Sequence, residues 1–576
     1  MDHRVALEKQ IRFVRVARGL EKADLVIKNC NYVNVFTGKI DYGDIGICDG
    51  YIIGVGNYEG EEEIDLAGRY LCPGLIDGHV HIESSMLTPS GFACAVLPHG
   101  TTTVIADPHE IANVCGVAGI EYMLAASKAS GIDVHLMLPS CVPSTDFENA
   151  GAILSVEDLV PLMNREGVLG LGEMMNYPGV LSGNEGVHQK LLAFQNKRID
   201  GHAPSVSGLD LNAYILSGIK TDHECTSSKE LMEKVSKGMY VLLREGSATR
   251  NVRDLIKGVN KYTSRYLLFC TDDKHPSDIK KEGHINYNIK IALEQDVDFI
   301  TAIQMATINV ANCYGLRDKG AIAPGYKADF IVFDDPKSFR IQEVYKEGRL
   351  VVKKGEVLIS QEAIRDTRVL QTVKLPDIKL ESLEIPLKSD YVKVIGINSD
   401  SLITTKCIRK IDRQDGRFVS NPKMDILKLI VVERHKRTGN IGKGLVEGYG
   451  LKNGAIGVTV AHDSHNLLVI GDSDRDMLIA IEELNRIQGG LVVVEKGRVI
   501  GSLALEVGGL MTDAPLDEVV KKLEVLESVA RRMGVAKGVD PFVTLAFMAL
   551  PVIPDLKLTD CGLFDVNLFS FVELEE

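Results

Sequence analysis

The chain has 576 residues, too many for one hydrophobic core, and its length indicates about three domains. Its content of 45% hydrophobic and 25% charged residues is typical of a globular enzyme, while a net charge of -14 argues against a nucleic acid partner, which needs Lys and Arg. No apolar stretch reaches the ~18 residues of a membrane span, and the scattered cysteines form no CxxC pair, so we expect a cytoplasmic protein with reduced thiols and no membrane partner.

Short strands that alternate polar and apolar side chains and break at glycine fill residues 23–71. The same texture returns at Ala328–Asp334 and Glu347–Gly355. Two β segments that flank a long middle region predict one small composite β-sandwich domain, built from residues 1–72 and 318–374.

The middle region, residues 73–317, contains eight strand-like runs, and a helical stretch or a long loop follows each of them. The runs are Leu75–Ile82, Thr101–Asp107, Val134–Pro139, Val168–Met174, Arg198–Ala203, Thr221–Cys225, Met239–Glu245 and Tyr266–Asp272. Their starts lie about 27 residues apart, close to the ~30 residues of a β-α-β unit. This spacing predicts an α/β fold with a (β/α)8 barrel, in preference to an open doubly wound sheet, and barrels of this kind place their chemistry at the carboxyl ends of the strands.

The pattern of polar and apolar residues changes again in residues 375–576. Strand-like runs at 455–460 and 490–495 alternate with helical stretches at 475–488 and 516–533. This segment is predicted to form a separate α+β domain, and no phosphate-binding fingerprint occurs in it.

Side chains that can bind metals end five of the eight runs. These side chains are His79, His81, Glu173, His202, His223 and Asp272. Residues at i and i+2 share one face of a strand, so His79 and His81 point the same way. A single histidine in a strand is more often a hydrogen-bonded core residue, but six such groups at one rim predict a metal site. Four imidazoles and two carboxylates can hold two divalent ions, with Glu173 as a bridge between them.

The order HxH, carboxylate, His, His, Asp resembles the amidohydrolase superfamily, and further motifs resemble its adenine deaminase family. These motifs are Gly78–Ser85, Ala106–Asn113, Gly170–Asn176, Asp200–Pro204, Asp222–Glu224, Cys270–Pro276 and, near the C-terminus, Val460–Asn466. The resemblance implies a distorted barrel with a composite β domain, and an additional C-terminal domain of the adenine deaminase type. It also implies a homodimer that acts in purine salvage.

The resemblance further implies hydrolysis of adenine to hypoxanthine and ammonia by a hydroxide that bridges two divalent ions. Mn2+ or Fe2+ are the expected ions, and Zn2+ is the alternative. A hydantoinase-like or dihydroorotase-like cyclic amidohydrolase, or a deaminase of another aminopurine, is the competing interpretation. Cyclic amidohydrolases usually have a carboxylated lysine on the fourth strand, where this chain has Glu173.

Asp272 and Glu173 are the expected catalytic residues, since Asp272 can accept the proton of the attacking water and pass it to the leaving amino group. A further group of residues is expected to contact the substrate or to orient a metal ligand, and the sequence does not indicate which residue has which role. It consists of Glu83, Glu110, His109, Asn176, Glu224 and His275, with Arg244 and Ser247 as weaker additions. The C-terminal residues His462, Asp463 and His465 are interpreted as a lid or as support for the fold, rather than as a third metal site.

Overall fold

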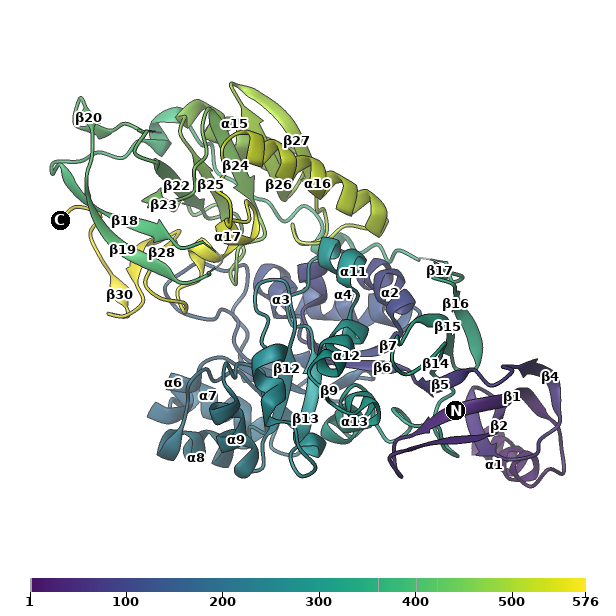
Figure 1. The fold of residues 1–576 in the computed structure, drawn as a ribbon. Helices are drawn as coiled ribbons and strands as arrows, with labels where there is room; N and C mark the ends of the chain where they lie inside the picture. The colour runs from purple at the N-terminus through teal and green to yellow at the C-terminus, as the bar shows by residue number, and fades with distance from the viewer. Residues whose placement is uncertain (1–2, 361, 400, 422) are drawn as a thin grey trace.

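The computed structural model describes residues 3–360, 362–399, 401–421 and 423–576. Figure 1 shows three parts: a β-rich part that includes the N-terminus, a central barrel, and a C-terminal domain drawn in green and yellow. Within the described residues, no helix is both long and apolar enough to cross a lipid bilayer.

Among the described residues, eight parallel strands form the wall of the barrel. They are β6 (Leu75–Val80), β7 (Thr101–Ala106), β8 (Asp133–Leu138), β9 (Val168–Met174), β10 (Arg198–Gly201), β11 (Thr221–Asp222), β12 (Tyr240–Arg244) and β13 (Leu267–Cys270). Each strand overlaps one of the runs predicted from the sequence, so the predicted barrel is confirmed. Strands β6 and β7 are buried throughout, as expected for parallel strands with both faces covered.

The barrel is distorted because its strands pair in two separate sheets. One sheet has the order β10-β9-β8-β7-β6 and the other the order β11-β12-β13. Side chains join β10 to β11: the Gly201 N–H donates to Thr221 Oγ1 at 3.1 Å, and the Ala203 N–H donates to Asp222 Oδ1 at 2.9 Å. On the other side, the Asp272 N–H donates to the His79 carbonyl at 2.9 Å. The closure next to β6 therefore brings two predicted metal ligands into neighbouring positions.

Helices surround the barrel strands (Figure 1). They are α2 (Pro89–Val96), α3 (His109–Cys115), α4 (Val117–Lys128), α5 (Val156–Leu159), α6 (Tyr177–Ser182), α7 (Glu185–Ala193), α8 (Gly208–Leu216), α9 (Ser228–Ser236), α10 (Val252–Leu255), α11 (Pro276–Glu282), α12 (Ile285–Glu294), α13 (Phe299–Met305) and α14 (Ile308–Tyr314). Local capping fixes several starts; before α9, for example, the Ser227 hydroxyl accepts the Glu230 N–H at 3.3 Å.

A mixed sheet joins the two segments that flank the barrel, and helix α1 (His3–Ala17) lies against it. Its strands are β1 (Ala23–Asn34), β2 (Lys39–Cys48), β3 (Tyr51–Val55), β4 (Gly60–Asp65), β5 (Tyr70–Pro73), β14 (Phe330–Phe333), β15 (Ile341–Lys346), β16 (Arg349–Lys353) and β17 (Glu356–Val357). The order is β17-β16-β15-β14-β5-β1-β2-β3, with β4 paired to β1. Strand β5 pairs antiparallel with β14 and leads directly into β6, so this sheet anchors the first barrel strand. The domain limits at residues 72, 317 and 374 stay predictions.

The C-terminal domain contains a large sheet with the order β19-β18-β23-β22-β25-β24-β26-β27. The strands and α-helices of the whole domain, including those outside this sheet, are β18 (Tyr391–Ile397), β19 (Thr404–Lys410), β20 (Arg413–Gln414), β21 (Arg417–Phe418), β22 (Ile426–Val432), β23 (Ile441–Glu447), β24 (Gly454–Val458), β25 (Leu467–Gly471), α15 (Asp474–Arg486), β26 (Gly490–Glu495), β27 (Arg498–Ala504), α16 (Leu516–Arg532), α17 (Val543–Ala546), β28 (Leu556–Thr559), β29 (Gly562–Asp565) and β30 (Ser570–Phe571). Helix α15 buries Met477 and Leu484 against this sheet.

The C-terminal domain packs on the barrel at the rim where the strands end. The Thr512 N–H donates to the Met86 carbonyl at 2.9 Å, and the Thr88 hydroxyl donates to Asp513 Oδ1 at 2.8 Å. In the loop after β8, the Asn149 amide donates to Asp560 Oδ2 at 2.7 Å. The loop between β24 and β25 also contacts the barrel, since the Asn466 amide donates to the Asn149 carbonyl at 2.8 Å.

Candidate metal centre

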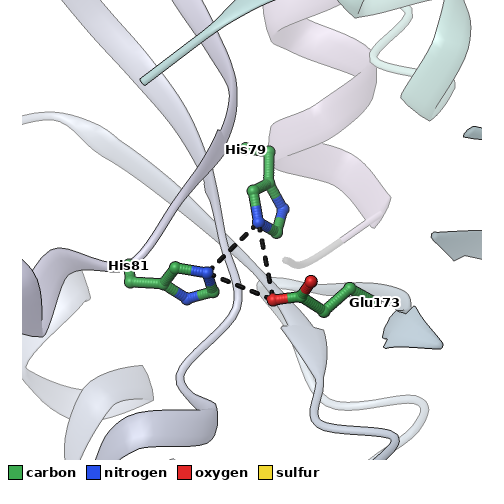
Figure 2. Close-up of side chains that lie close together, drawn as sticks. All are labelled: His79, His81 and Glu173. Atoms are coloured by element: carbon green, nitrogen blue, oxygen red, sulfur yellow. Dashed lines mark hydrogen bonds and ion pairs between the residues drawn. The ribbon is translucent and has the colours of Figure 1, made fainter. Parts of the chain in front are cut away.

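His79, His81 and Glu173 meet at the rim of the barrel, where β6 and β9 end. Figure 2 shows both imidazole rings turned toward one carboxylate oxygen of Glu173. The Nε2 atoms of the two histidines lie 3.3 Å apart, and Glu173 Oε1 lies 3.2 Å from His81 Nε2 and 3.7 Å from His79 Nε2. All three side chains are at most 3% exposed, so their polar atoms have little access to solvent.

The other oxygen of Glu173 faces a second pair of histidines. Glu173 Oε2 lies 2.5 Å from His202 Nδ1 and 3.2 Å from His223 Nε2. Asp272 lies beside the first pair of histidines, His79 and His81, with its Oδ1 atom 3.0 Å from His81 Nε2. The structure thus brings together all six residues predicted as ligands, and places Glu173 between two pairs of imidazoles.

The spacing of these donor atoms fits divalent cations. Ligand atoms about 2.1 Å from a tetrahedral ion stand roughly 3.4 Å from one another. Most of the separations given above lie between 3.0 and 3.7 Å, while Glu173 Oε2 and His202 Nδ1 are closer, at 2.5 Å. The Nε2 atom of His223 is buried and makes no hydrogen bond to any residue that the structure describes. The Nδ1 atom of His81 lies 2.9 Å from the Asp107 carbonyl, and by donating its proton there it leaves the Nε2 lone pair free for a metal.

Two carboxylates that the sequence analysis did not select hold two of the predicted ligands in place. Asp107 Oδ2 accepts the Glu173 N–H at 2.9 Å, and Asp77 Oδ1 accepts the His79 N–H at 3.2 Å. The close approach of Asp107 needs a glycine, since a Cβ atom at Gly172 would lie 2.1 Å from Asp107 Oδ2. The position of Asp107 at the end of its predicted strand, on the same rim as the ligands, was the available signal.

Arg244 lies beside two carboxylates of the rim. Its Nη1 atom donates to Asp272 Oδ2 at 2.5 Å and also to Glu224 Oε1. Burial by itself raises the pKa of Asp272, but the charge of Arg244 and the hydrogen bonds from the neighbouring histidines hold that pKa well below its usual value. Burial likewise opposes ionisation of Glu224, yet the charges of Arg244, His202 and His223 lower its pKa to about 2. Both groups are therefore carboxylates at neutral pH.

Glu83, Glu110 and His109 line the rim next to the pair of histidines His79 and His81. Glu83 accepts the Ile111 N–H at 3.2 Å through Oε1, while its buried Oε2 has no hydrogen-bond partner among the described residues. Burial raises the pKa of Glu83 to about 7. His109 lies between two carboxylates, with Nε2 3.4 Å from Glu110 Oε1 and Nδ1 3.4 Å from Glu173 Oε1.

Two of the remaining predicted residues lie apart from the cluster. The Asn176 side chain accepts the Gly179 N–H at 2.8 Å and so caps helix α6. His275 lines a cavity of about 950 Å³ between the barrel rim and the C-terminal domain, together with Ser247 and Met86. Within the described residues, no hydrogen bond or ion pair joins either side chain to the six clustered groups.

Comparisons with known proteins agree with this geometry. The amidohydrolase family matches residues 70–351, and the adenine deaminase C-terminal domain matches residues 401–570. The adenine deaminase 2 of Carboxydothermus hydrogenoformans is 51% identical over 97% of this chain and 98% of its own. The adenine deaminase of Clostridium acetobutylicum is 48% identical over 97% of this chain and 99% of its own, and that of Geobacillus kaustophilus is 48% identical over 96% and 97%. Membership of the amidohydrolase family implies that divalent metal ions are bound.

Proposed function

Because this chain belongs to the adenine deaminases of the amidohydrolase family, we propose that it hydrolyses adenine to hypoxanthine and ammonia at the rim of its barrel. The identity over almost the full length of each relative supports the substrate. The structural observation that supports the chemistry is the position of Glu173, whose two carboxylate oxygens each face a pair of histidines. A homodimer, a cytoplasmic location and a role in purine salvage belong to the same proposal.

We assign two divalent ions to this centre, Mn2+ or Fe2+ first and Zn2+ as the alternative. His79, His81 and Asp272 would hold one ion, His202 and His223 would hold the other, and Glu173 would bridge them. When bound, the ions supply Lewis acidity that makes water a stronger acid and a better nucleophile near neutral pH.

Asp272 is the group that moves the proton of the attacking water. Arg244 binds its Oδ2 atom, which leaves Oδ1 directed at the histidine cluster. As the bond between water oxygen and C6 of adenine forms, Oδ1 accepts a proton. Asp272 then gives this proton to the amino group while the bond from C6 to nitrogen breaks, and ammonia leaves.

Glu83 is the acid that we assign to ring nitrogen N1. Attack at C6 puts negative charge into the ring, and a proton on N1 neutralises it. Of the three rim carboxylates predicted from the sequence, Glu110 has both oxygens beside histidines and Glu224 is paired with Arg244. Of these three, only Glu83 combines a buried position with an oxygen that has no partner among the described residues. The product keeps the proton on N1, and the proton lost from the new C6 hydroxyl restores Glu83.

The direct test is a substrate comparison with protein reconstituted separately with Mn2+, Fe2+ and Zn2+. Adenine should yield equal amounts of hypoxanthine and ammonia, while adenosine, a hydantoin and dihydroorotate should react far more slowly. Fast turnover of a hydantoin or of dihydroorotate with none of adenine would reject the proposed substrate in favour of a cyclic amidohydrolase.

A further inference from the structure

The C-terminal domain places two histidines on one carboxylate of the barrel. Glu110, in the first turn of α3, is 2% exposed. Its Oε1 atom lies 2.8 Å from His462 Nδ1, and its Oε2 atom accepts a hydrogen bond from His465 Nε2. Both histidines belong to the loop between β24 and β25, more than 350 residues further along the chain. This contact joins two domains through three side chains that belong to residues at most 5% exposed.

The hydrogen-bond partners argue against a third cation at this cluster. His465 Nδ1 lies 3.1 Å from the Ala461 N–H, and a backbone N–H can only donate. His465 Nδ1 is therefore an acceptor, and the ring carries its proton on Nε2, the atom that faces Glu110. A proton on Nε2 leaves no lone pair there for an ion, so the cluster is a hydrogen-bonded network.

The loop that carries the two histidines is anchored both in its own domain and on the barrel. The buried Arg434 donates from Nε to the His465 carbonyl at 2.5 Å, and His435 Nε2 lies 2.8 Å from the Ser464 carbonyl. The Ser464 hydroxyl donates to Glu148 Oε2 of the barrel at 2.6 Å. These bonds hold the loop in one position before a substrate arrives.

Glu110 connects this loop to the metal centre through His109. His109 Nε2 lies 3.4 Å from Glu110 Oε1, and Nδ1 lies 3.4 Å from Glu173 Oε1, the oxygen that faces His79 and His81. His109 Nδ1 is buried and has no hydrogen-bond partner among the described residues. A shift of the Glu110 carboxylate would therefore move the His109 ring relative to the bridging carboxylate.

We propose that His462 and His465 are positioning residues of the active site, which fix Glu110 and, through it, His109 against Glu173. The C-terminal domain then positions groups of the active site, in addition to closing it from solvent. This inference rests on the proposed function, because its effect is on the rate of adenine deamination.

The two histidines contact Glu110 through different ring nitrogens, and this difference gives a crossed test. An asparagine amide takes the place of Nδ1, and a glutamine amide takes the place of Nε2. His462→Asn and His465→Gln should therefore keep the bond to Glu110, whereas His462→Gln and His465→Asn should lose it. Asp560→Asn is the control, because it weakens the interdomain contact with Asn149 without touching Glu110.

We expect the two bond-keeping variants and the control to keep kcat within about threefold of the parent, while the two bond-losing variants lose about tenfold to hundredfold. The KM for adenine and the bound metal should stay within about twofold of the parent values in all five. If the two histidines had a purely structural role, His462→Gln and His465→Asn would lower Tm, while kcat per folded molecule would stay unchanged.

The inference is overturned if the same amide, asparagine or glutamine, gives the higher kcat at both positions. It is also overturned if all four variants keep the kcat of the parent, or if kcat falls only in the variants that lose bound metal. A parent protein that releases no ammonia from adenine would be a failure of the proposed function. In that case the Tm values of the metal-free variants still show whether His462 Nδ1 and His465 Nε2 bind Glu110. If they do, His462→Gln and His465→Asn should have lower Tm values than His462→Asn and His465→Gln.

Discussion

Arg244 Nη1 lies 2.5 Å from Oδ2 of Asp272, on a carboxylate whose other oxygen faces the histidines of the metal centre. This contact fixes which oxygen of Asp272 is available for proton transfer. It also keeps the carboxylate ionised in a buried site, where an unpaired charge is costly.

Replacing Arg244 should therefore damage both stability and chemistry. In Arg244→Met, the buried Asp272 and Glu224 lose their cationic partner, and breaking a buried pair in this way costs about 3–5 kcal/mol. We expect a lower Tm and at least about tenfold slower turnover, with Arg244→Lys intermediate because lysine keeps the charge without the planar fork. Ammonia release and thermal unfolding measure the two effects, and an unchanged kcat in Arg244→Met would refute this role.

Asp272→Asn tests the proton carrier. The amide cannot accept and release the proton, so we expect a loss of about 100-fold to 10,000-fold in kcat while much of the metal is retained. Metal analysis and initial rates with adenine give the comparison. High activity in Asp272→Asn would move the role to Asp273, whose Oδ1 atom accepts a hydrogen bond from the Ser84 hydroxyl at 2.5 Å.

Gly172→Ala tests the support behind Glu173. The new methyl group would overlap Asp107 Oδ2, so this carboxylate must leave the Glu173 N–H. We expect metal affinity to fall about tenfold to hundredfold. Gly186→Ala in helix α7 is the control, because the new Cβ would meet only Asn184 Oδ1, at an ordinary contact distance of 3.6 Å. Equal metal affinity in both variants, measured by competition with a chelator, would show that Asp107 does not position the bridge.

Glu148 should make the stability of the protein depend on pH. Burial, together with the charges of Asp463 and Asp560, raises the pKa of Glu148 to about 8, above the value of 4.5 for a free glutamate. Between these two pH values the folded state holds a proton that the unfolded state has lost, so stability falls as pH rises from about 4.5 to 8. The Tm of the parent should drop between pH 6 and pH 9, and Glu148→Gln should reduce this drop. A drop of the same size in the variant would exclude Glu148 as its source.

The sequence was sufficient for the barrel and its six clustered side chains because both follow from local patterns. Parallel strands with both faces buried are continuous apolar runs, and their carboxyl ends must share one rim. His79 and His81 could be placed on one face from their i, i+2 spacing alone.

Contacts made by loops could not be predicted in the same way, because they depend on how distant segments pack. Nothing in the spacing of Glu110 and His465 indicates that they share a hydrogen bond across two domains. Asn176 was expected to contact the substrate or to orient a ligand, and this stays a prediction; its capping of α6 through the amide oxygen depends on the local turn after β9. Arg244 could be named from its position at the end of a strand, while its pairing with Asp272 depended on the closure of the barrel.

Metal content before and after Glu173→Gln tests the central claim most directly. After reconstitution with Mn2+, the parent and the exposed control variant Glu482→Gln on α15 should each hold two ions per chain and deaminate adenine. Glu173→Gln should hold fewer ions and lose turnover, because one neutral amide cannot replace a carboxylate shared by two imidazole pairs. Two ions per chain with full activity in Glu173→Gln would contradict the bridging role on which the account depends.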